Sequence, residues 1–254
     1  ITPSYVTCTE EYNGSSWTAG GAVITARVGA AGDGTQDAAF IAGGWTGTSI
    51  VSCVELYNGT SWASANALIT ARENASGAGT QNAGLAIAGM IPGNSIINLT
   101  EEFDGTNWSA GGALSTSRYA LAGGGTQNAA LAFAGNTTAS PSINSTGVTE
   151  EYNGTSWSAG GTMNQARNYL AGDSTSTDDA IAMGGMNPST KLTCVETYNG
   201  TSWSTAVPFS TATNTASGVG SSTAGMMMGG LNPGITSQVL LYNTGTDLCS
   251  TTPF

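Results

Sequence analysis

The stretch Thr-Glu-Glu-Tyr-Asn-Gly-Thr-Ser-Trp-Ser-Ala-Gly-Gly, residues 149–161, is one of six copies of a single unit. Near-copies occupy residues 9–21, 54–66, 100–112 and 195–207, and a more divergent copy occupies 239–250. Each of the first five has an aromatic residue, an Asn-Gly or Asp-Gly pair, and then a Trp. Asn-Gly is the preferred pair for a two-residue type I′ turn, because both central residues need positive φ. Each copy therefore predicts a β-hairpin.

The aromatic residue before the turn recurs at a regular spacing along the chain. It stands at Tyr12, Tyr57, Phe103, Tyr152, Tyr198 and Tyr242. A period of roughly 45 residues with four strands per unit is typical of β-propeller blades. A unit that cannot bury both of its faces alone must stack on its neighbours.

A second repeated block lies between the hairpins and reads as strand, turn and strand. It occupies residues 27–44, 72–89, 118–135, 167–185 and 213–230, and small residues dominate it. Small residues suit crowded strands near a propeller axis, where backbones approach closely. The segments that follow differ in length and sequence: 45–51, 90–98, 136–147, 186–193 and 231–238. Variable loops on a constant scaffold are where recognition usually occurs, although tolerated drift is the alternative.

These residues together resemble the kelch family of β-propellers. The resemblance rests on an Arg that opens the blade, a small-residue strand ending in Gly43-Gly44, a Val54-Glu55-Leu56-Tyr57 strand, and a Trp after the turn. The sequence departs from the kelch pattern where Gly89 and Gly135 stand alone and where Asn-Gly replaces Asp-Pro. The amino-acid sequences of the copies also resemble the repeats of marine-type phage structural proteins, such as tail fibres. The resemblance implies a binding or structural scaffold and supplies no activity.

We therefore predict an all-β fold, a kelch-like β-propeller of four-stranded antiparallel blades in one domain spanning 1–254. The repeats are 27–71, 72–117, 118–166, 167–212 and 213–254, after a half-blade hairpin at 1–26. Five blades with an extra N-terminal hairpin are favoured. Six blades are the alternative, with the first hairpin completing a blade whose inner pair is supplied differently; a β-solenoid is the rival fold. Because the sequence starts at Ile1 without a leader, we expect a processed product or a fragment.

The charge balance excludes several classes of partner. The formal net charge is −11, with five cationic residues in 254. A nucleic-acid-binding surface needs clustered Lys and Arg, and so does a contact with anionic membrane. No run of eighteen apolar residues is present, so we expect no membrane insertion.

The charged residues that do occur follow the repeat. Four arginines share one repeat position and five glutamates share another: Arg27, Arg72, Arg118 and Arg167; Glu10, Glu55, Glu101, Glu150 and Glu196. Each glutamate falls on a strand face that a neighbouring blade covers, where an unpaired carboxylate is costly. We predict Arg–Glu pairs around the ring as structural elements. A ring of catalytic carboxylates is the alternative, but residues repeated in every blade are usually scaffold.

Three of the four cysteines also share a repeat position: Cys8, Cys53 and Cys194. Equivalent positions in separate blades are too far apart to bond. Closure of the ring would bring Cys8 near Cys249, so a disulfide between these two is one hypothesis. Inert buried thiols are the other.

The acidic cluster found in one copy only comprises Asp173, Asp178 and Asp179. Such side chains could bind Ca²⁺ through oxygen ligands, and a solvated turn is the alternative. The chain has no histidine, which removes the common general base, the Ser-His-Asp triad and the usual copper and zinc ligands. We expect no cofactor and no catalytic residues.

Three functions remain. The first is a non-enzymatic structural or adhesion propeller on a virion or extracellular surface, which binds a protein or glycan through its variable loops. It would belong to a larger particle or a homo-oligomer. The second is a lectin-like module with one carbohydrate site per blade. The third is a glycosidase, which requires two carboxylates converging within roughly 5–9.5 Å.

Overall fold

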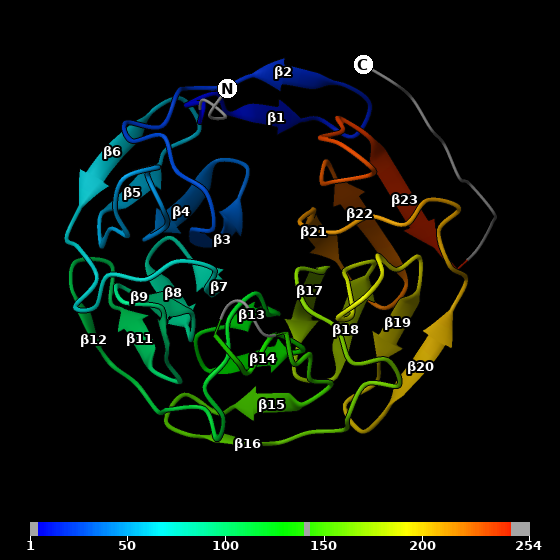
Figure 1. Cartoon of the computed structure of the whole chain (residues 1–254). Helices are drawn as coiled ribbons and strands as arrows, with labels where there is room; N and C mark the ends of the chain where they lie inside the picture. Colours follow the sequence, from blue (N-terminus) through cyan, green and yellow to red (C-terminus); the bar gives the residue numbers. More distant parts are fainter. Residues whose placement is uncertain (1–4, 140–142, 245–254) are drawn as a thin grey trace.

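The computed structural model describes residues 5–139 and 143–244, and every regular element among them is a β-strand. Five antiparallel sheets stand around a central axis as the blades of a propeller, and an extra two-stranded sheet lies at the N-terminal side (Figure 1). This confirms the predicted fold class. None of the described residues forms a helix with the length and hydropathy needed to cross a membrane.

The blades follow chain order, and the first strand of each lies nearest the axis (Figure 1). Blade 1 comprises β3 (Ala31–Thr35), β4 (Ala38–Ala42), β5 (Val54–Tyr57) and β6 (Trp62–Ala65). Blade 2 comprises β7 (Ser76–Thr80), β8 (Ala83–Ile87), β11 (Thr100–Phe103) and β12 (Trp108–Ala110). Blade 3 comprises β13 (Ala122–Thr126), β14 (Ala129–Phe133), β15 (Thr149–Tyr152) and β16 (Trp157–Ala159).

Blade 4 comprises β17 (Ala171–Ser176), β18 (Asp179–Met183), β19 (Val195–Tyr198) and β20 (Trp203–Ala206). Blade 5 has three strands within the described residues: β21 (Ser217–Gly220), β22 (Ala224–Met228) and β23 (Val239–Asn243). The extra N-terminal sheet comprises β1 (Glu10–Tyr12) and β2 (Trp17–Ala19). A small sheet of β9 (Met90–Ile91) and β10 (Ser95–Ile96) lies in the loop of blade 2.

The repeated hairpin forms as predicted, but its turn is not type I′. Tyr152 pairs with Trp157, and the turn is centred on Gly154 and Thr155. Gly154 has φ +86, whereas Asn153 is not among the residues with positive φ. The Asn153 side chain accepts hydrogen bonds from the backbone N–H groups of Thr155 (3.0 Å) and Ser156 (2.9 Å). The type I′ prediction was wrong because the Asn side chain, rather than a second positive φ, completes the turn.

Each second strand ends in two residues with left-handed backbone. The second of the pair is Gly in all five blades, with φ between +92 and +109: Gly44, Gly89, Gly135, Gly185 and Gly230. The first has φ near +60, and here Ala88 (+58) and Ala134 (+63) replace the Gly of the other blades. A small L-residue tolerates the left-handed helical region, whereas only glycine readily adopts φ near +100. This explains why Gly89 and Gly135 stand alone in the sequence.

Four buried ion pairs join the repeated arginines to the repeated glutamates. The pairs are Arg27–Glu55 (2.6 Å), Arg72–Glu101, Arg118–Glu150 (3.0 Å) and Arg167–Glu196 (2.5 Å). In blade 3, Arg118 also donates to the carbonyl of Val148 (2.9 Å), and Glu150 accepts from the Ser115 N–H (2.8 Å). Burial lowers the pKa of Arg118 to about 10, which leaves it charged at neutral pH. The pairs therefore tie the loop before each blade to its second and third strands.

The fifth glutamate, Glu10, behaves differently. It is exposed on β1 and has no arginine partner within the described residues. Blade 5 lacks both charges, because Thr213 takes the arginine position and Leu240 the glutamate position. Both are buried, together with Met227, which replaces the Ala of blades 2 to 4. The joint loss of Arg and Glu in one blade indicates that each residue is present because of the other.

Neighbouring blades are joined by hydroxyl contacts that also vary together. The Tyr198 hydroxyl donates to Glu151 of the preceding blade (2.8 Å), and Tyr152 donates to Glu102 in the same way. In blade 2 the aromatic is Phe103, which has no hydroxyl, and the facing residue is Leu56 rather than Glu. A carboxylate is thus retained only where a hydroxyl meets it.

The tryptophans make the second inter-blade contact. The indole N–H of Trp157 donates to Thr100 Oγ1 (2.9 Å), and that of Trp203 donates to Thr149 Oγ1 (2.8 Å). Trp108 faces Val54 instead, and its buried indole N–H has no partner among the described residues. The ring of each of the five hairpin tryptophans also packs on the aromatic of its own hairpin, with centroids 4.8–5.1 Å apart.

Candidate functional site

The five variable loops gather at one end of the propeller, which we call the loop face. Each leaves the end of a blade's second strand and returns to its third, and in each blade it is bridged to the segment before the first strand, as in Val28–Trp45 and Asn168–Met186. A second bridge makes each loop a short hairpin of its own, for example Trp45–Ile50 and Met186–Lys191. The sequence predicted which segments vary, and the ring brings them together.

An open ring of backbone hydrogen bonds lies around the axis at the loop face. Four residues each donate an N–H to the carbonyl of the equivalent residue in the preceding blade, with N–O distances of 2.6–2.9 Å. The linked residues all have φ between +48 and +63, and they are Gly29, Asn74, Ala120, Tyr169 and Thr215. These residues also line the mouth of a channel along the axis.

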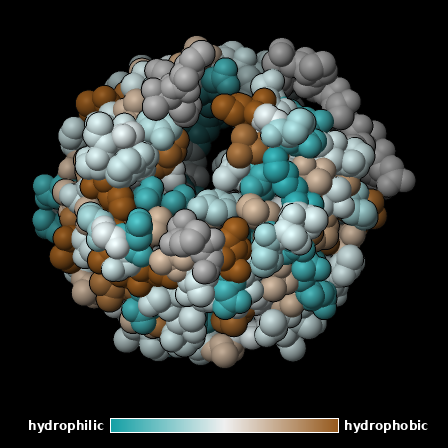
Figure 2. All heavy atoms as spheres, in the orientation of Figure 1, coloured by the Kyte–Doolittle hydropathy of each residue, from teal (hydrophilic) through white to brown (hydrophobic). Residues whose placement is uncertain are grey.

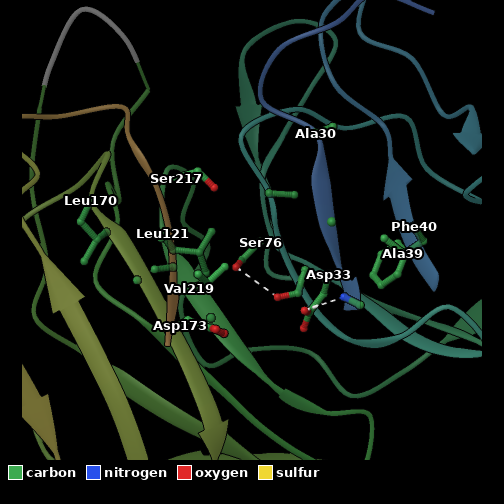
Figure 3. Close-up of a pocket in the computed structure, with 18 of the residues that line it drawn as sticks. Ala30, Asp33, Ala39, Phe40, Ser76, Leu121, Leu170, Asp173, Ser217 and Val219 are labelled. Carbon is green, nitrogen blue, oxygen red and sulfur yellow. Dashed lines mark hydrogen bonds between the residues drawn. The ribbon is translucent and has the colours of Figure 1, made fainter. Parts of the chain in front are cut away.

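The channel widens into two connected cavities that share residues such as Leu121 and Leu170. The cavity at the mouth has a volume of about 510 Å³, and the deeper one about 380 Å³. Figure 2 views the molecule along the axis and shows the hollow at its centre. Figure 3 shows Asp33 and Asp173 on the walls of the deeper cavity, with Ser217 nearer its other end. Asp33 and Asp173 occupy the same position on the innermost strands of blades 1 and 4.

Both carboxyl groups of the deeper cavity are shifted toward the protonated form. Burial raises the pKa of Asp33 from 3.8 to about 7; the Gly34 N–H opposes the shift and the Asp173 charge adds to it. Burial also raises the pKa of Asp173, and N–H groups of Gly220 (2.9 Å) and Ser174 (2.8 Å) oppose this. Each carboxyl group therefore accepts hydrogen bonds from an N–H of its own strand and from an N–H of the next blade, which is Gly79 for Asp33 and Gly220 for Asp173. These bonds link neighbouring blades without any ligand.

Because the pKa of Asp33 is raised in the folded protein, we predict that this residue lowers the stability of the fold at high pH. Between pH 4 and pH 7 the folded protein keeps a proton that the unfolded chain releases, so stability falls as the pH rises through this range. The cost is complete above pH 7 and absent below about pH 4. We expect Asp33→Asn to raise the melting temperature by a few degrees at pH 8, with the gain shrinking to nothing at pH 4. Thermal melts from pH 4 to pH 8 measure this.

Asp104→Asn is the matched control. Asp104 is exposed, and the N–H groups of Asn107 and Thr106 lower its pKa, so its charged form is the one that folding favours. Asn stands at this turn position in the five other copies, so the geometry is preserved. Asp104→Asn should therefore be neutral or slightly destabilising at pH 8. An Asp33→Asn variant that is less stable than the wild type at pH 8 would contradict the assigned burial cost.

A separate cleft on the loop face lies between the loops of blades 1 and 2. It has a volume of about 560 Å³, and its lining includes Trp45, Ser49, Glu73, Pro92 and Asn94. Burial raises the pKa of Glu73, with no hydrogen bond contributing, so this half-buried carboxylate has no donor within the described residues. An aromatic ring, an unpartnered carboxylate and several hydroxyl and amide groups thus converge in one concave site.

Neither Trp45 nor Glu73 belongs to the repeat. The positions equivalent to Trp45 are occupied by Met90, Asn136, Met186 and Leu231, and those equivalent to Glu73 by Val28, Tyr119, Asn168 and Asn214. Glu73 is also the only glutamate outside the hairpin copies. Sequence reasoning missed this pair because the two residues lie 28 positions apart in different repeats. Comparing the copies column by column would have singled out both.

The acidic residues proposed for Ca²⁺ do not converge. Asp173 lines the deeper of the two cavities on the axis, which we call the axial cavity. Asp178 accepts a hydrogen bond from Ser176 Oγ (2.5 Å), and Asp179 accepts one from Thr175 Oγ1 (2.7 Å). Within residues 5–139 and 143–244, no three His, Cys, Asp or Glu side chains are grouped to hold a metal ion.

The three cysteines that the structure describes are free thiols. Cys8 is exposed, and its predicted disulfide partner Cys249 lies outside the described residues. Cys194 is half-buried beside the Arg167–Glu196 pair, where Arg167 Nη1 approaches its sulfur to 2.7 Å, and burial raises its pKa. A thiol held in this way is part of the scaffold.

The cationic side chains are held almost entirely in contacts within the scaffold. The side chains of all four arginines are fully buried, and the single lysine, Lys191, donates to the Leu231 carbonyl (2.8 Å). The exposed charge of the molecule is therefore acidic.

A scan against protein-family models finds no match to this chain, and a search of curated proteins also finds none.

Proposed function

We propose that this protein is a non-enzymatic recognition propeller that binds a neutral glycan through its loop face, in the cleft between blades 1 and 2. The observation that carries the proposal is the convergence of Trp45 and Glu73, two residues outside the repeat, in one concave site. Residues shared by all blades maintain the ring. Residues that break the pattern and meet in a cleft need another reason, and ligand binding supplies it.

The chemistry of the cleft suits a sugar. Its volume falls within the roughly 300–1,000 Å³ range of small-molecule sites, which combine apolar or aromatic walls with a few polar groups. Trp45 offers a flat apolar surface, and Ser49, Thr48 and Asn94 offer groups that both donate and accept. A sugar hydroxyl that donates to Glu73 would restore the hydrogen bonding that burial removes from this carboxylate.

The electrostatics favour a neutral ligand over a polyanion. With every arginine buried in an ion pair, the loop face offers Lys191 alone as a cationic side chain. Sulfated or phosphorylated ligands would lack counter-charges. Figure 2 shows mixed polar and apolar patches around the central hollow, without one extended apolar surface. A hydroxyl-rich ligand without charge matches this composition.

The setting we propose is the surface of a virion or another extracellular surface, where the propeller acts in adhesion, alone or as part of a larger particle. The kelch-like repeat pattern and the phage-like wording of the copies support this assignment. The low content of charged residues and the absence of histidine are consistent with a scaffold rather than an enzyme. A protein carrying the same polar groups is the other partner class for the loop face.

Glycan-array screening followed by titration of the best oligosaccharide tests the proposal. We expect Trp45→Ala to weaken binding at least about thirtyfold, because a central aromatic anchor typically contributes 2 kcal/mol or more. Glu73→Gln should weaken it less. Met186→Ala, at the Trp45 position of blade 4, should leave the affinity unchanged. Equal losses in Met186→Ala and Trp45→Ala would refute a single site and favour one site per blade.

A glycosidase is the second candidate, because the axial cavity brings together Asp33 and Asp173. Two carboxyl groups with different protonation states are the usual machinery for glycosidic cleavage. Incubating the bound oligosaccharide with the protein and measuring new reducing ends separates the two functions. We expect none; release that Asp33→Asn abolishes would establish the enzyme instead.

A further inference from the structure

The N-terminal sheet packs on blade 1 as each blade packs on the next. The Tyr57 hydroxyl donates to Glu11, and the Trp62 indole donates to Thr9 Oγ1 (3.1 Å), which repeats the contacts between blades 2 and 3. Figure 1 places β1 and β2 on the rim between β6 and β23, with no described strand between them and the axis. β1–β2 is thus positioned as the outer half of a blade.

The hydrogen-bonded ring at the mouth is open at the same place. Its four links run from Gly29 through Asn74, Ala120 and Tyr169 to Thr215. Within the described residues, the Gly29 N–H has no acceptor and the Thr215 carbonyl has no donor. These two groups are the ones that a sixth residue, linked in the same way between Thr215 and Gly29, would pair.

Side chains of the N-terminal sheet and of blade 1 also lack the partners that their equivalents have, and Glu10 is the first of them. Glu10 is exposed, whereas Glu55, Glu101, Glu150 and Glu196 are 1–3% exposed. In blades 1 to 4 the paired arginine lies just before the first strand of the same blade, and no such segment stands beside β1 within the described residues.

The glutamine at the turn of the inner hairpin shows the same loss. Gln81 donates to carbonyls of Tyr57 (2.5 Å) and Ala39 (3.4 Å) in the preceding blade, and Gln127 makes the equivalent bonds to blade 2. Gln36, at this position in blade 1, reaches only Glu11 (3.4 Å). The carbonyl that Ala39 supplies to Gln81 has no counterpart for Gln36 among the described residues.

The sheet faces on the two sides of this opening are uncovered. Val219 on β21 and Val28 before β3 are each 44% exposed, whereas the inner strands of blades 2 to 4 pack directly on one another. A Cβ on Gly77 would lie 2.5–2.7 Å from backbone atoms of Gly32 in the preceding blade. A Cβ on Gly32 would meet only atoms of its own blade. The two faces that border the opening therefore lack the covering strands that their equivalents in blades 2 to 4 have.

We propose that the space bounded by β3, β21 and β1 is a seat for one more inner β-hairpin of this repeat, joined ahead of β1, which completes a sixth blade with β1–β2. The hairpin supplies an arginine for Glu10, a carbonyl for the Gly29 N–H and an N–H for the Thr215 carbonyl. Its small residues cover Val219 and Gly32. Chain order identifies this occupant, because in every blade the inner hairpin precedes the outer one. The seat is independent of the proposed glycan site.

A grafted hairpin tests the seat. A second copy of residues 114–148, the inner part of blade 3, is fused directly ahead of Thr9 in place of residues 1–8, which matches the junction of Val148 to Thr149. We expect the fusion to melt at a higher temperature and to slow hydrogen exchange of the Gly29 amide at least tenfold. A fusion with the same residues in scrambled order should do neither.

Glu10→Gln provides the decisive comparison. In the chain without the graft, Glu10 is exposed and the change should be neutral. In the fusion it should reduce the folding equilibrium constant about a hundredfold or more, because it leaves a buried arginine unpaired. A Glu10→Gln effect of the same size in both proteins would overturn the proposal. The proposal would also be overturned if the Gly29 amide already exchanges hydrogen slowly in the chain without the graft and exchanges fast once residues 245–254 are removed.

Discussion

Replacing Arg118 by Met is expected to lower the free energy of unfolding by about 3–5 kcal/mol, the usual cost of removing one partner from a buried ion pair. The Arg118 side chain is fully buried, with Nη2 3.0 Å from Glu150 Oε1 and 3.2 Å from the Ala132 carbonyl. Without it, the carboxylate of Glu150 and two backbone carbonyls are buried with no cation. Urea unfolding of both proteins at pH 7 measures the difference.

Blade 5 supplies the control for this prediction. Its equivalents of Arg118, Ala132 and Glu150 are Thr213, Met227 and Leu240, each about 1% exposed. The triple variant Arg118→Thr, Ala132→Met, Glu150→Leu copies this apolar packing into blade 3. We expect it to come within about 1.5 kcal/mol of the wild type, since apolar replacements of buried pairs are close to neutral. If the triple variant is as unstable as Arg118→Met, the loss is one of packing rather than of an unpaired charge.

Gly135→Ala is the second substitution with a large expected cost, about 2–6 kcal/mol. Gly135 has φ +109, a backbone conformation that costs an L-residue roughly 1–3 kcal/mol. Its new Cβ would also lie 3.0 Å from the Tyr119 carbonyl oxygen and 3.1 Å from Leu121 Cβ, and such crowding costs about 1–3 kcal/mol. Urea unfolding again provides the measurement.

Gly229→Ala is the matched control, because it changes the first position of the equivalent two-residue pair in blade 5. Gly229 has φ +66, and blades 2 and 3 already carry Ala88 and Ala134 at this position. A Cβ on Gly229 would lie 3.5 Å from the Thr236 carbonyl oxygen, which is an ordinary contact. We therefore expect a cost of about 1–2 kcal/mol, that of an L-residue in the left-handed helical region. A Gly229→Ala variant that loses as much stability as Gly135→Ala would show that φ and crowding do not distinguish the two positions.

Much of the architecture could be predicted because each repeated residue makes a local or nearest-neighbour contact. The Asn-Gly pairs mark the hairpins, and the small residues mark the inner strands. A glutamate on a covered face and an arginine in every blade lead to the pairs that Glu150 and Arg118 exemplify. The expectation of a covered strand face and an arginine partner fails at Glu10, because β1 has no inner strand pair beside it within the described residues.

The candidate sites could not be predicted, because they form only when the ring is assembled. Trp45 and Glu73 meet across a blade boundary, and Asp33 and Asp173 meet across the axis, each from repeats that look alike in sequence. The turn type was also missed, because Asn153 completes the turn through its side chain. The residues that the copies share form the scaffold, and the residues in which they differ form the clefts of the loop face.

A crystal structure of the protein with a bound oligosaccharide tests most directly the claim that recognition occurs where the repeat is broken. The account predicts electron density for one ligand, stacked on Trp45 and hydrogen-bonded to Glu73, in the cleft between blades 1 and 2. Density repeated at equivalent clefts of several blades, or placed beside Asp33 and Asp173 in the axial cavity, would contradict it.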